Sequence, residues 1–196
     1  MKLILLVLIG FLNSLCAQSK IELNPELETL SRLSKDSLIA MAIKQIDYST
    51  FDPASFDTVE GWSSSEGVFI KFIRFIQVIP KKGRLCFSVT VDLINKSIGY
   101  SELGGSNVDD AILFYKPNHE DDAIINQIKK AMAQNGKNVL SGEIITIEDG
   151  DHFFNVHIDS ESSSGRFRID KSTSKISDES HRHKVPVTNL SLQRIF

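Results

Sequence analysis

The strongest hydrophobic pattern in the chain runs from Asp121 to Gly136. Apolar residues recur there at spacings of one, three and four positions, which places them on one face of a helix. These residues are Ile124, Ile125, Ile128, Ala131 and Met132. Asp121 or Asp122 can accept hydrogen bonds from the first free backbone N–H groups, and Asn135–Gly136 supplies a left-handed stop. The pattern therefore predicts an amphipathic helix over this segment.

The hydrophobic period changes to two after this helix. Residues 144–147 are mostly β-branched, as strands prefer, and residues 148–151 read Glu-Asp-Gly-Asp, a tight-turn signal. Apolar and polar side chains then alternate over 154–158 and over 166–170, with a polar turn at 160–165 between them. Such alternation is typical of half-buried strands. We expect three antiparallel strands to follow the helix.

The first half of the chain shows a related order. Residues 24–27 predict a short helix with Pro25 in its first turn, and a wide apolar stripe predicts an amphipathic helix that begins at Ser34. A short strand is expected at 56–59. Residues 68–79 then form a very apolar run that predicts a long strand, in which a bulge near Ile73 accounts for polar residues at every third position. An amphipathic helix is the alternative for this run.

A hairpin is predicted to follow this long strand. Residues 80–83 read Pro-Lys-Lys-Gly, a turn signal, and they lead into a strand over 85–94. Alternation places Cys86 on the more polar face of that strand. The basic tip carries Lys81, Lys82 and Arg84, which suit an anionic partner or a membrane surface. A long central strand buried under a helix, with no binding role for the basic tip, is the other interpretation.

One short pattern occurs twice along the chain. Residues 91–98 align without gaps with residues 169–176, and both read aliphatic–Asp, a short polar turn, then Ile. One helix and then apolar strands precede each copy. The chain is therefore predicted to be α+β, with two similar helix-plus-antiparallel-sheet units at 34–103 and 109–176, joined near the Gly-Gly pair at 104–105. A single larger α+β domain is the alternative.

The second of these segments resembles a known kind of domain. A helix, then strands, then the turn at 169–176 is similar to the PepSY-like and cystatin-like families of small exported bacterial domains, which end in a V-D-x-x-T-G-x-V-like turn. Ser174 stands where these families usually have Gly, and Asn95–Lys96 replaces Thr-Gly in the first copy. The resemblance implies a cystatin-like fold in tandem copies, and a function in protein–protein contact that includes restraint of a peptidase.

The two ends of the chain carry further signals. Lys2 and the apolar run 3–12 predict a signal peptide over 1–17, cleaved after Ala17, because the run is shorter than the roughly 20 residues of a membrane span. We therefore expect a secreted or periplasmic protein, with a lipid anchor at Cys16 as the alternative. Residues 18–33 form an N-terminal extension. Residues 177–196 are predicted to be a polar tail with an edge strand at 185–192, in which Pro186 limits pairing with a further strand. The apolar end, Ile195–Phe196, is expected to dock on the rest of the protein.

Composition narrows the function classes. The formal net charge of −3 argues against nucleic acid, which binds a basic face. Cleavage would leave Cys86 as the only one of the two cysteines, so no internal disulfide is expected. No later stretch is long and apolar enough to span a membrane. The chain lacks the hydrolase, zinc-protease, Walker and dinucleotide motifs, so we expect no enzyme, no catalytic residue and no cofactor.

Two groups of potential metal ligands, at 149–152 and 178–183, lack the spacing of zinc or calcium sites, so we expect no metal.

The leading hypothesis is an exported, non-catalytic protein-binding module or envelope accessory protein with an unknown protein partner. Its predicted contact residues are Trp62, Lys81, Lys82 and Arg84. The alternative is a small-molecule or metal-binding enzyme with a pocket between helix and sheet. The candidate polar residues for such a pocket are His152, His157 and Asp170. The enzyme hypothesis predicts that they converge in one concavity, whereas the binding-module hypothesis predicts that they face solvent.

Overall fold

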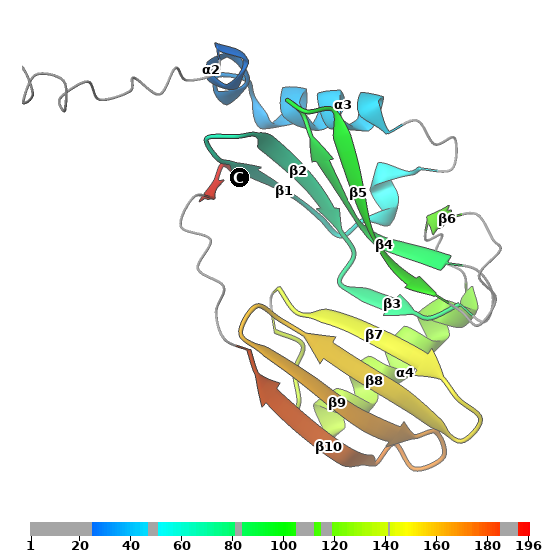
Figure 1. The fold of residues 1–196 in the computed structure, drawn as a ribbon. Helices are drawn as coiled ribbons and strands as arrows, with labels where there is room; N and C mark the ends of the chain where they lie inside the picture. Colours follow the sequence, from blue (N-terminus) through cyan, green and yellow to red (C-terminus); the bar gives the residue numbers. More distant parts are fainter. Residues whose placement is uncertain are drawn as a thin grey trace, which may run out of the picture.

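The computed structural model describes residues 25–46, 51–80, 84–104, 112–114, 119–140, 142–184 and 192–196. The predicted signal peptide and residues 18–24 lie outside this range, as does most of the edge strand predicted at 185–192. The helices of the described part are α2 (Pro25–Ser31), α3 (Lys35–Gln45) and α4 (His119–Gln134), with a 3-10 turn at Pro53–Ser55. The strands form two sheets, which Figure 1 shows one above the other. The chain is therefore α+β, as predicted.

Sheet A has the strand order β11-β1-β2-β4-β5, and β6 pairs in parallel with the start of β4. Its strands are β1 (Thr58–Ser63), β2 (Val68–Ile73), β4 (Arg84–Asp92), β5 (Ser97–Gly104), β6 (Ile112–Phe114) and β11 (Gln193–Arg194). Sheet B has the order β10-β9-β8-β7-β3, in which only the β3–β7 pair is parallel. Its strands are β3 (Ile76–Val78), β7 (Ile144–Asp149), β8 (Phe153–Asp159), β9 (Ser163–Asp170) and β10 (Ile176–His183).

The predicted helices form where their capping signals lie. Pro25 is the first residue of α2, where its missing N–H leaves no bond unmade. The Ser34 side chain accepts a hydrogen bond from the Ser37 backbone N–H at the start of α3. Helix α4 begins at His119, slightly before the predicted start, and Gly136 ends it with a φ of +70°.

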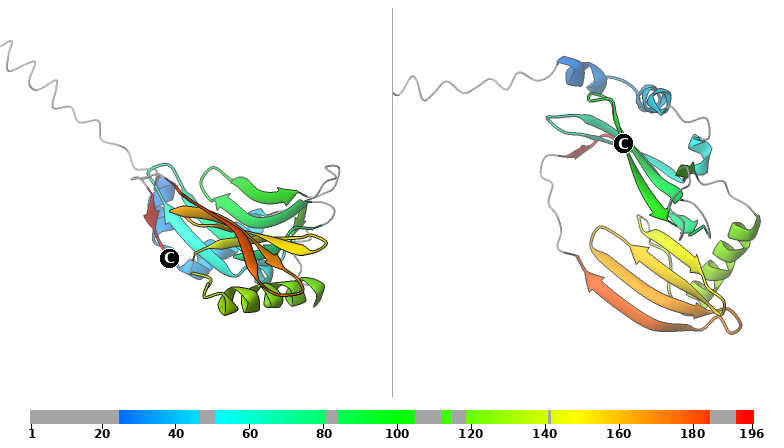
Figure 2. Two further views of the ribbon diagram at one scale, coloured as in Figure 1. Left: turned by 90° about the horizontal axis from the view of Figure 1, so that it is seen from below. Right: turned by 45° about the vertical axis from the view of Figure 1, so that its right-hand side comes forward.

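Each sheet packs one face against helices. Helices α2 and α3 cover sheet A, and α4 covers sheet B (Figure 2). The first core joins Leu38 and Ala42 of α3 to Ile70 and Phe72 of β2. The second core joins α4 to alternate residues of β7, β8 and β9, and includes Ile128, Met132, Ile147, Val156 and Phe167. Full burial of each large apolar side chain stabilises the fold by about 1.5–3 kcal/mol, which makes the two cores the main source of stability.

The long strand predicted over residues 68–79 is wrong. Strand β2 ends at Ile73 in sheet A, and β3 begins at Ile76 in sheet B. Polar contacts turn the chain between them: the Arg74 Nη1 donates to the Ser55 carbonyl oxygen at 2.9 Å, and the Phe75 backbone N–H donates to Asp57 Oδ2 at 2.7 Å. The polar spacing that suggested a bulge therefore marks a crossing from one sheet to the other.

The hairpin predicted at residues 80–83 is also wrong. Strand β3 lies in sheet B, whereas β4 lies in sheet A and pairs with β2, β5 and β6. The Ile79 backbone N–H donates to the Ile147 carbonyl oxygen at 2.7 Å, which keeps the chain on sheet B up to this connection. Lys81 and Lys82 lie outside the described residues. The Pro-Lys-Lys-Gly signal correctly predicts that a strand ends before it, but it does not show that the next strand belongs to the other sheet.

The placement of Cys86 on the polar face of β4 is wrong as well. The register of β4 against β5 shifts between Cys86 and Ser88. One extra residue in a strand reverses the faces that follow it, so Cys86 lies on the same side as Val89 and Val91, in the first core. The thiol is fully buried and its Sγ donates to the Ser88 carbonyl oxygen at 3.3 Å.

The C-terminal region divides differently from the prediction. Residues 176–183 form β10, the edge strand of sheet B, rather than a tail. The polar turn predicted at 160–165 is shorter, because β9 already begins at Ser163. Residues 112–114, assigned by sequence to the second unit, pair with β4 of sheet A. The expectation that the last residues dock is confirmed: Phe196 packs against the first core.

The two copies of the repeated pattern form the same turn. Asp92 ends β4 and Asp170 ends β9; each Oδ1 accepts hydrogen bonds from the backbone N–H groups two and three residues later, at 2.7–3.1 Å. Four residues after each Asp, the backbone is left-handed, with φ of +53° at Lys96 and +57° at Ser174. Left-handed backbone favours Gly, so Lys96 and Ser174 both occupy positions where Gly would be less strained.

Ser174→Gly is expected to raise the free energy of unfolding by about 0.5–1 kcal/mol. A left-handed backbone costs a non-Gly residue roughly 1–2 kcal/mol, and the greater freedom of Gly in the unfolded chain offsets about half of this. Urea unfolding monitored by circular dichroism measures the change. Ser174→Ala keeps the Cβ atom and serves as the control with no gain. Equal stability of the two variants would contradict the argument from backbone strain.

Candidate functional site

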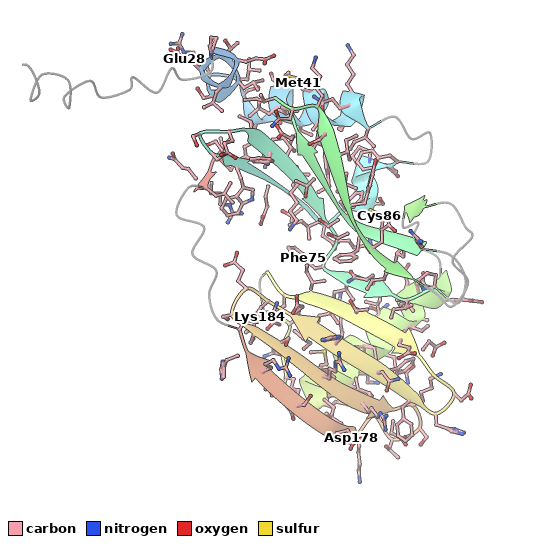
Figure 3. The ribbon with its side chains drawn as sticks, in the orientation of Figure 1. Glu28, Met41, Phe75, Cys86, Asp178 and Lys184 are labelled. Atoms are coloured by element: carbon pink, nitrogen blue, oxygen red, sulfur yellow. The ribbon has the colours of Figure 1, made fainter. Side chains whose placement is uncertain are left out.

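A groove of about 690 Å³ opens between α4 and the segment where the chain passes from sheet A to sheet B. Its walls are α4, the crossing segment 74–76 between β2 and β3, and the loop 139–143 that follows α4. Phe75 lies at this crossing, between the two sheets (Figure 3). The apolar side chains of the groove are Phe75, Ile76, Ile125, Val139 and Leu140. The groove therefore joins Asp57 and segment 74–76 to α4 and the loop after it, which come much later in the sequence.

The two loop residues are unusually exposed for their type. Leu140 is 64% exposed and Val139 is 37% exposed, whereas most large apolar side chains of the described part lie in the two cores. Burying one such side chain in a complex stabilises it by about 1.5–3 kcal/mol. Exposed apolar side chains that gather in a groove mark contact sites more often than singly scattered ones do. This combination makes the groove the strongest candidate binding site.

Hydrogen bonds hold the groove walls in place. Glu143 Oε2 accepts from the Leu140 backbone N–H at 2.9 Å, which fixes the loop. Asp57 Oδ2 accepts from the Phe75 backbone N–H, and Arg74 Nε donates to the Ile76 carbonyl oxygen at 3.0 Å. A preformed site loses less conformational entropy on binding than a mobile one.

The charges around the groove are mixed, with an excess of acid. The acidic groups are Asp57, Asp122 and Glu143, and the basic groups are Arg74 and Lys129. The Arg74 guanidinium already donates to backbone carbonyl oxygens. The described residues of the lining supply carboxylates, one amide, one amine and a guanidinium, and none of these described residues is His, Cys or Ser. This lining can bind an apolar group flanked by cations, and its described residues include no nucleophile beside a base.

The described contact residues predicted from sequence are not brought together. Trp62 pairs with Phe69 of β2, which in turn pairs with Asp92 at the end of β4. Arg84 begins β4, eight residues from Asp92, which is roughly 26 Å along a strand. Arg84 Nη1 forms an ion pair with Glu102 at 3.4 Å, and the Arg194 guanidinium lies 5.7 Å from the Trp62 ring centre.

The polar residues named for an enzyme pocket do not converge either. A cavity of about 580 Å³ on the face of sheet B opposite α4 includes His157 but neither His152 nor Asp170 in its lining. His152 is exposed in the β7–β8 turn, and Asp170 is engaged in its own turn. Burial, and then the neighbouring Arg166, lower the pKa of His157. Both effects favour the neutral form of the His157 ring.

In the second group of potential metal ligands, at 178–183, the Glu179 carboxylate already has two side-chain partners. Glu179 forms an ion pair with Lys137 and a 2.8 Å contact with His181 Nε2. These two partners lower the pKa of the Glu179 carboxyl. Among the residues that the structure describes, no three His, Cys, Asp or Glu side chains gather closely enough to hold a metal ion.

Sequence reasoning missed the groove. The available signal was the apolar pair Val139–Leu140 within the polar run between α4 and β7. Adjacent apolar residues in a loop stand out because loops usually lie on the surface. The other walls could not be inferred, since the crossing of segment 74–76 into sheet B depends on pairing with β7.

Cys86 is expected to resist alkylation in the folded protein. Burial raises the pKa of its thiol to about 12, so almost no thiolate forms at pH 8, and the thiolate is the reactive species. Peptide mapping after iodoacetamide treatment should find Cys86 unmodified under native conditions and fully modified in denaturant. Native alkylation at the rate of a small free thiol would contradict its burial.

Asp170 makes stability depend on pH in the acid range. Hydrogen bonds from Ser172 and Thr173 lower the pKa of its carboxyl from 3.8 to about 2. A lowered pKa adds stability above the unfolded value, near 4, that is lost as the pH falls through about 2. Asp170→Asn should therefore lower the urea midpoint at pH 7, with a difference that shrinks between about pH 4 and pH 2. A difference that stays constant over this range would contradict the assignment to the carboxylate.

No described helix has the length and apolar character needed to cross a membrane. Comparisons with protein-family models, with curated proteins and with solved structures found no match to this chain. The groove and the residues around it are therefore the basis on which a function is proposed.

Proposed function

We propose that the chain is an exported, non-catalytic protein-binding module whose partner surface is the groove between α4, segment 74–76 and loop 139–143. The observation that carries the proposal is the exposure of Leu140, at 64%, beside Val139 in a groove whose other apolar side chains are Phe75, Ile76 and Ile125. A protein partner would insert an apolar side chain there. The excess of acidic groups on the rim favours basic residues beside that side chain.

Export rests on the N-terminal sequence pattern. Residues 1–17 have the basic start, apolar run and small residue before the cut that are typical of a signal peptide. An exported module with this fold fits an envelope accessory protein, and restraint of a peptidase is the form of binding that the cystatin-like resemblance implies. The buried Cys86 is compatible with an oxidising compartment, since burial protects its thiol from exchange.

We also infer that the two helix-and-sheet assemblies are copies of one cystatin-like unit. Sheet A places β1, β2, β4 and β5 side by side after α3, and sheet B places β7, β8, β9 and β10 side by side after α4. In both, the last hairpin contains the Asp turn with a left-handed residue four positions later. The same order and the same turn support duplication. The enzyme alternative has no comparable observation in its favour.

The groove can be tested by capture of a partner. The mature protein, from Gln18 onward and with a C-terminal tag, is used to capture proteins from an envelope and secreted-protein extract of the source organism. Leu140→Glu should weaken binding of the captured partner at least tenfold, because about 1.4 kcal/mol of lost apolar contact suffices for that. Affinity is then measured with the purified partner by calorimetry.

Matched controls separate this groove from other surfaces. Met41→Glu changes an apolar side chain of α3 that is 37% exposed, and it should leave binding unchanged. A variant with Lys81, Lys82 and Arg84 changed to Glu, and a Trp62→Ala variant, test the contact residues predicted from sequence. Loss of binding in these variants but not in Leu140→Glu would place the partner elsewhere and reject the groove.

A further inference from the structure

The end of the chain occupies a strand-binding site on sheet A. Strand β11 lies antiparallel to β1, with Trp62 opposite Arg194 and Ser63 opposite Gln193. It follows β10 of sheet B in the sequence but lies at the far edge of sheet A (Figure 2). The segment Gln193–Phe196 therefore contacts sheet A as a separate short peptide would.

A glycine makes room for the last side chain. A Cβ atom on Gly61 would lie 2.5 Å from Cε1 of the Phe196 ring, so any larger residue there would displace the ring. The Gly61 N–H donates to the Phe196 carbonyl oxygen at 3.1 Å, and the Ile195 N–H donates to the Gly61 carbonyl oxygen at 2.7 Å. Two tail residues thus oppose one residue of β1, as in a bulge.

Side chains add selectivity to these backbone bonds. Arg194 lies over the Trp62 ring and its Nη2 is 3.3 Å from Glu60 Oε1. The Phe196 ring packs against the first core, and Lys35 Nζ lies 5.0 Å from its centre. The site therefore selects an extended segment that carries a cation and, two residues later, an aromatic ring.

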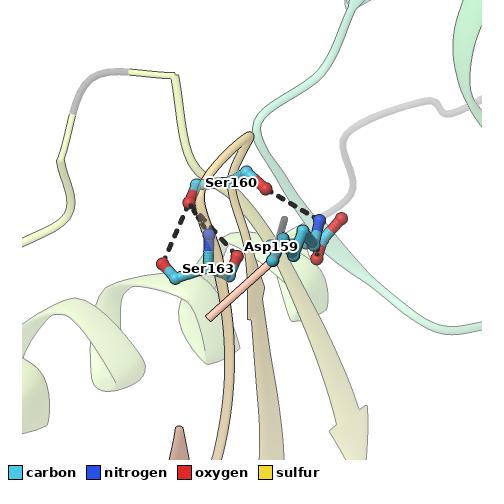
Figure 4. Close-up of polar contacts among 4 residues, drawn as sticks. Asp159, Ser160 and Ser163 are labelled. Carbon is cyan, nitrogen blue, oxygen red and sulfur yellow. Dashed lines mark hydrogen bonds and ion pairs between the residues drawn. The ribbon is translucent and has the colours of Figure 1, made fainter. Parts of the chain in front are cut away.

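The start of the tail is anchored on the other sheet. Lys184 follows β10, and its Nζ donates to the Ser160 carbonyl oxygen at 2.7 Å and pairs with Asp159 at 2.6 Å. Its backbone N–H donates to the Ser162 carbonyl oxygen at 2.9 Å. Figure 4 shows the turn between β8 and β9 that contains Ser160. Residues 185–192 alone connect this anchor to β11.

We propose that the β1 edge at Gly61 is a strand-binding site that also accepts the segment Gln193–Phe196 of a second copy of this chain, so that two copies can exchange tails. A second copy carries the identical segment, and the contacts at the site are the same whether the segment comes from its own chain or from another. Only the connection differs, which is the usual basis of strand swapping. This partner and surface are distinct from the groove of the proposed function.

Two full-length variants test the exchange by complementation. Phe196→Ala leaves the site intact but removes the ring that fills it. Gly61→Val blocks the site and frees an intact tail. Neither variant should dimerise alone, whereas a mixture should form a one-to-one heterodimer in native mass spectrometry and light scattering. Absence of the heterodimer from two folded variants would overturn the proposal.

Control variants tie the heterodimer to the tail. A Gly61→Val/Phe196→Ala double variant mixed with Phe196→Ala should give no dimer, and a dimer there would also overturn the proposal. If Gly61→Val unfolds by circular dichroism, Gly61→Ala replaces it, since its Cβ already meets the ring. In a second measurement, a labelled peptide of residues 187–196 should bind Phe196→Ala at least tenfold more tightly than the wild-type chain, whose own tail competes. Equal binding to both would reject the site.

Discussion

The parallel pairing of β3 with β7 is the contact on which the arrangement of this protein depends. By sequence β3 lies between β2 and β4, both in sheet A, yet its hydrogen bonds are made in sheet B. The Ile145 N–H donates to the Phe75 carbonyl oxygen at 2.6 Å, and the Ile79 N–H to the Ile147 carbonyl oxygen at 2.7 Å. Because unpaired buried backbone groups are costly, these bonds fix segment 74–76 where it lines the groove.

A second strand crosses in the opposite direction. Strand β11 follows sheet B in the sequence and pairs with β1 of sheet A. Sheet A is therefore extended beyond β1 by β11, and sheet B is extended beyond β7 by β3. Exposed strand edges invite pairing with other chains, and these two segments cover one edge each. The two features with consequences for binding, the groove and the strand-binding site, both lie where the chain crosses between sheets.

Several elements follow from short segments of the sequence alone. Helix α4 lies where its apolar spacing and its stop at Gly136 indicate, and α3 begins after Ser34 as predicted. The alternating faces of β8 and β9 were also predicted correctly. The two Asp turns were predicted from their aligned residues, and both place a non-Gly residue, Lys96 or Ser174, in left-handed backbone. Of the groove, only the α4 wall was predicted, because the approach of segment 74–76 depends on the pairing of β3 with β7.

Local sequence signals predict the α+β class, the end of α4 at Gly136 and the two Asp turns, because their hydrogen bonds and caps join residues a few positions apart. Tertiary structure decided the break after Ile73, the bulge that turns Cys86 into the core and the position of β11. Each of these depends on which remote strand supplies the partner backbone groups. A strand pattern shows which face is apolar, but it does not name the neighbouring strand.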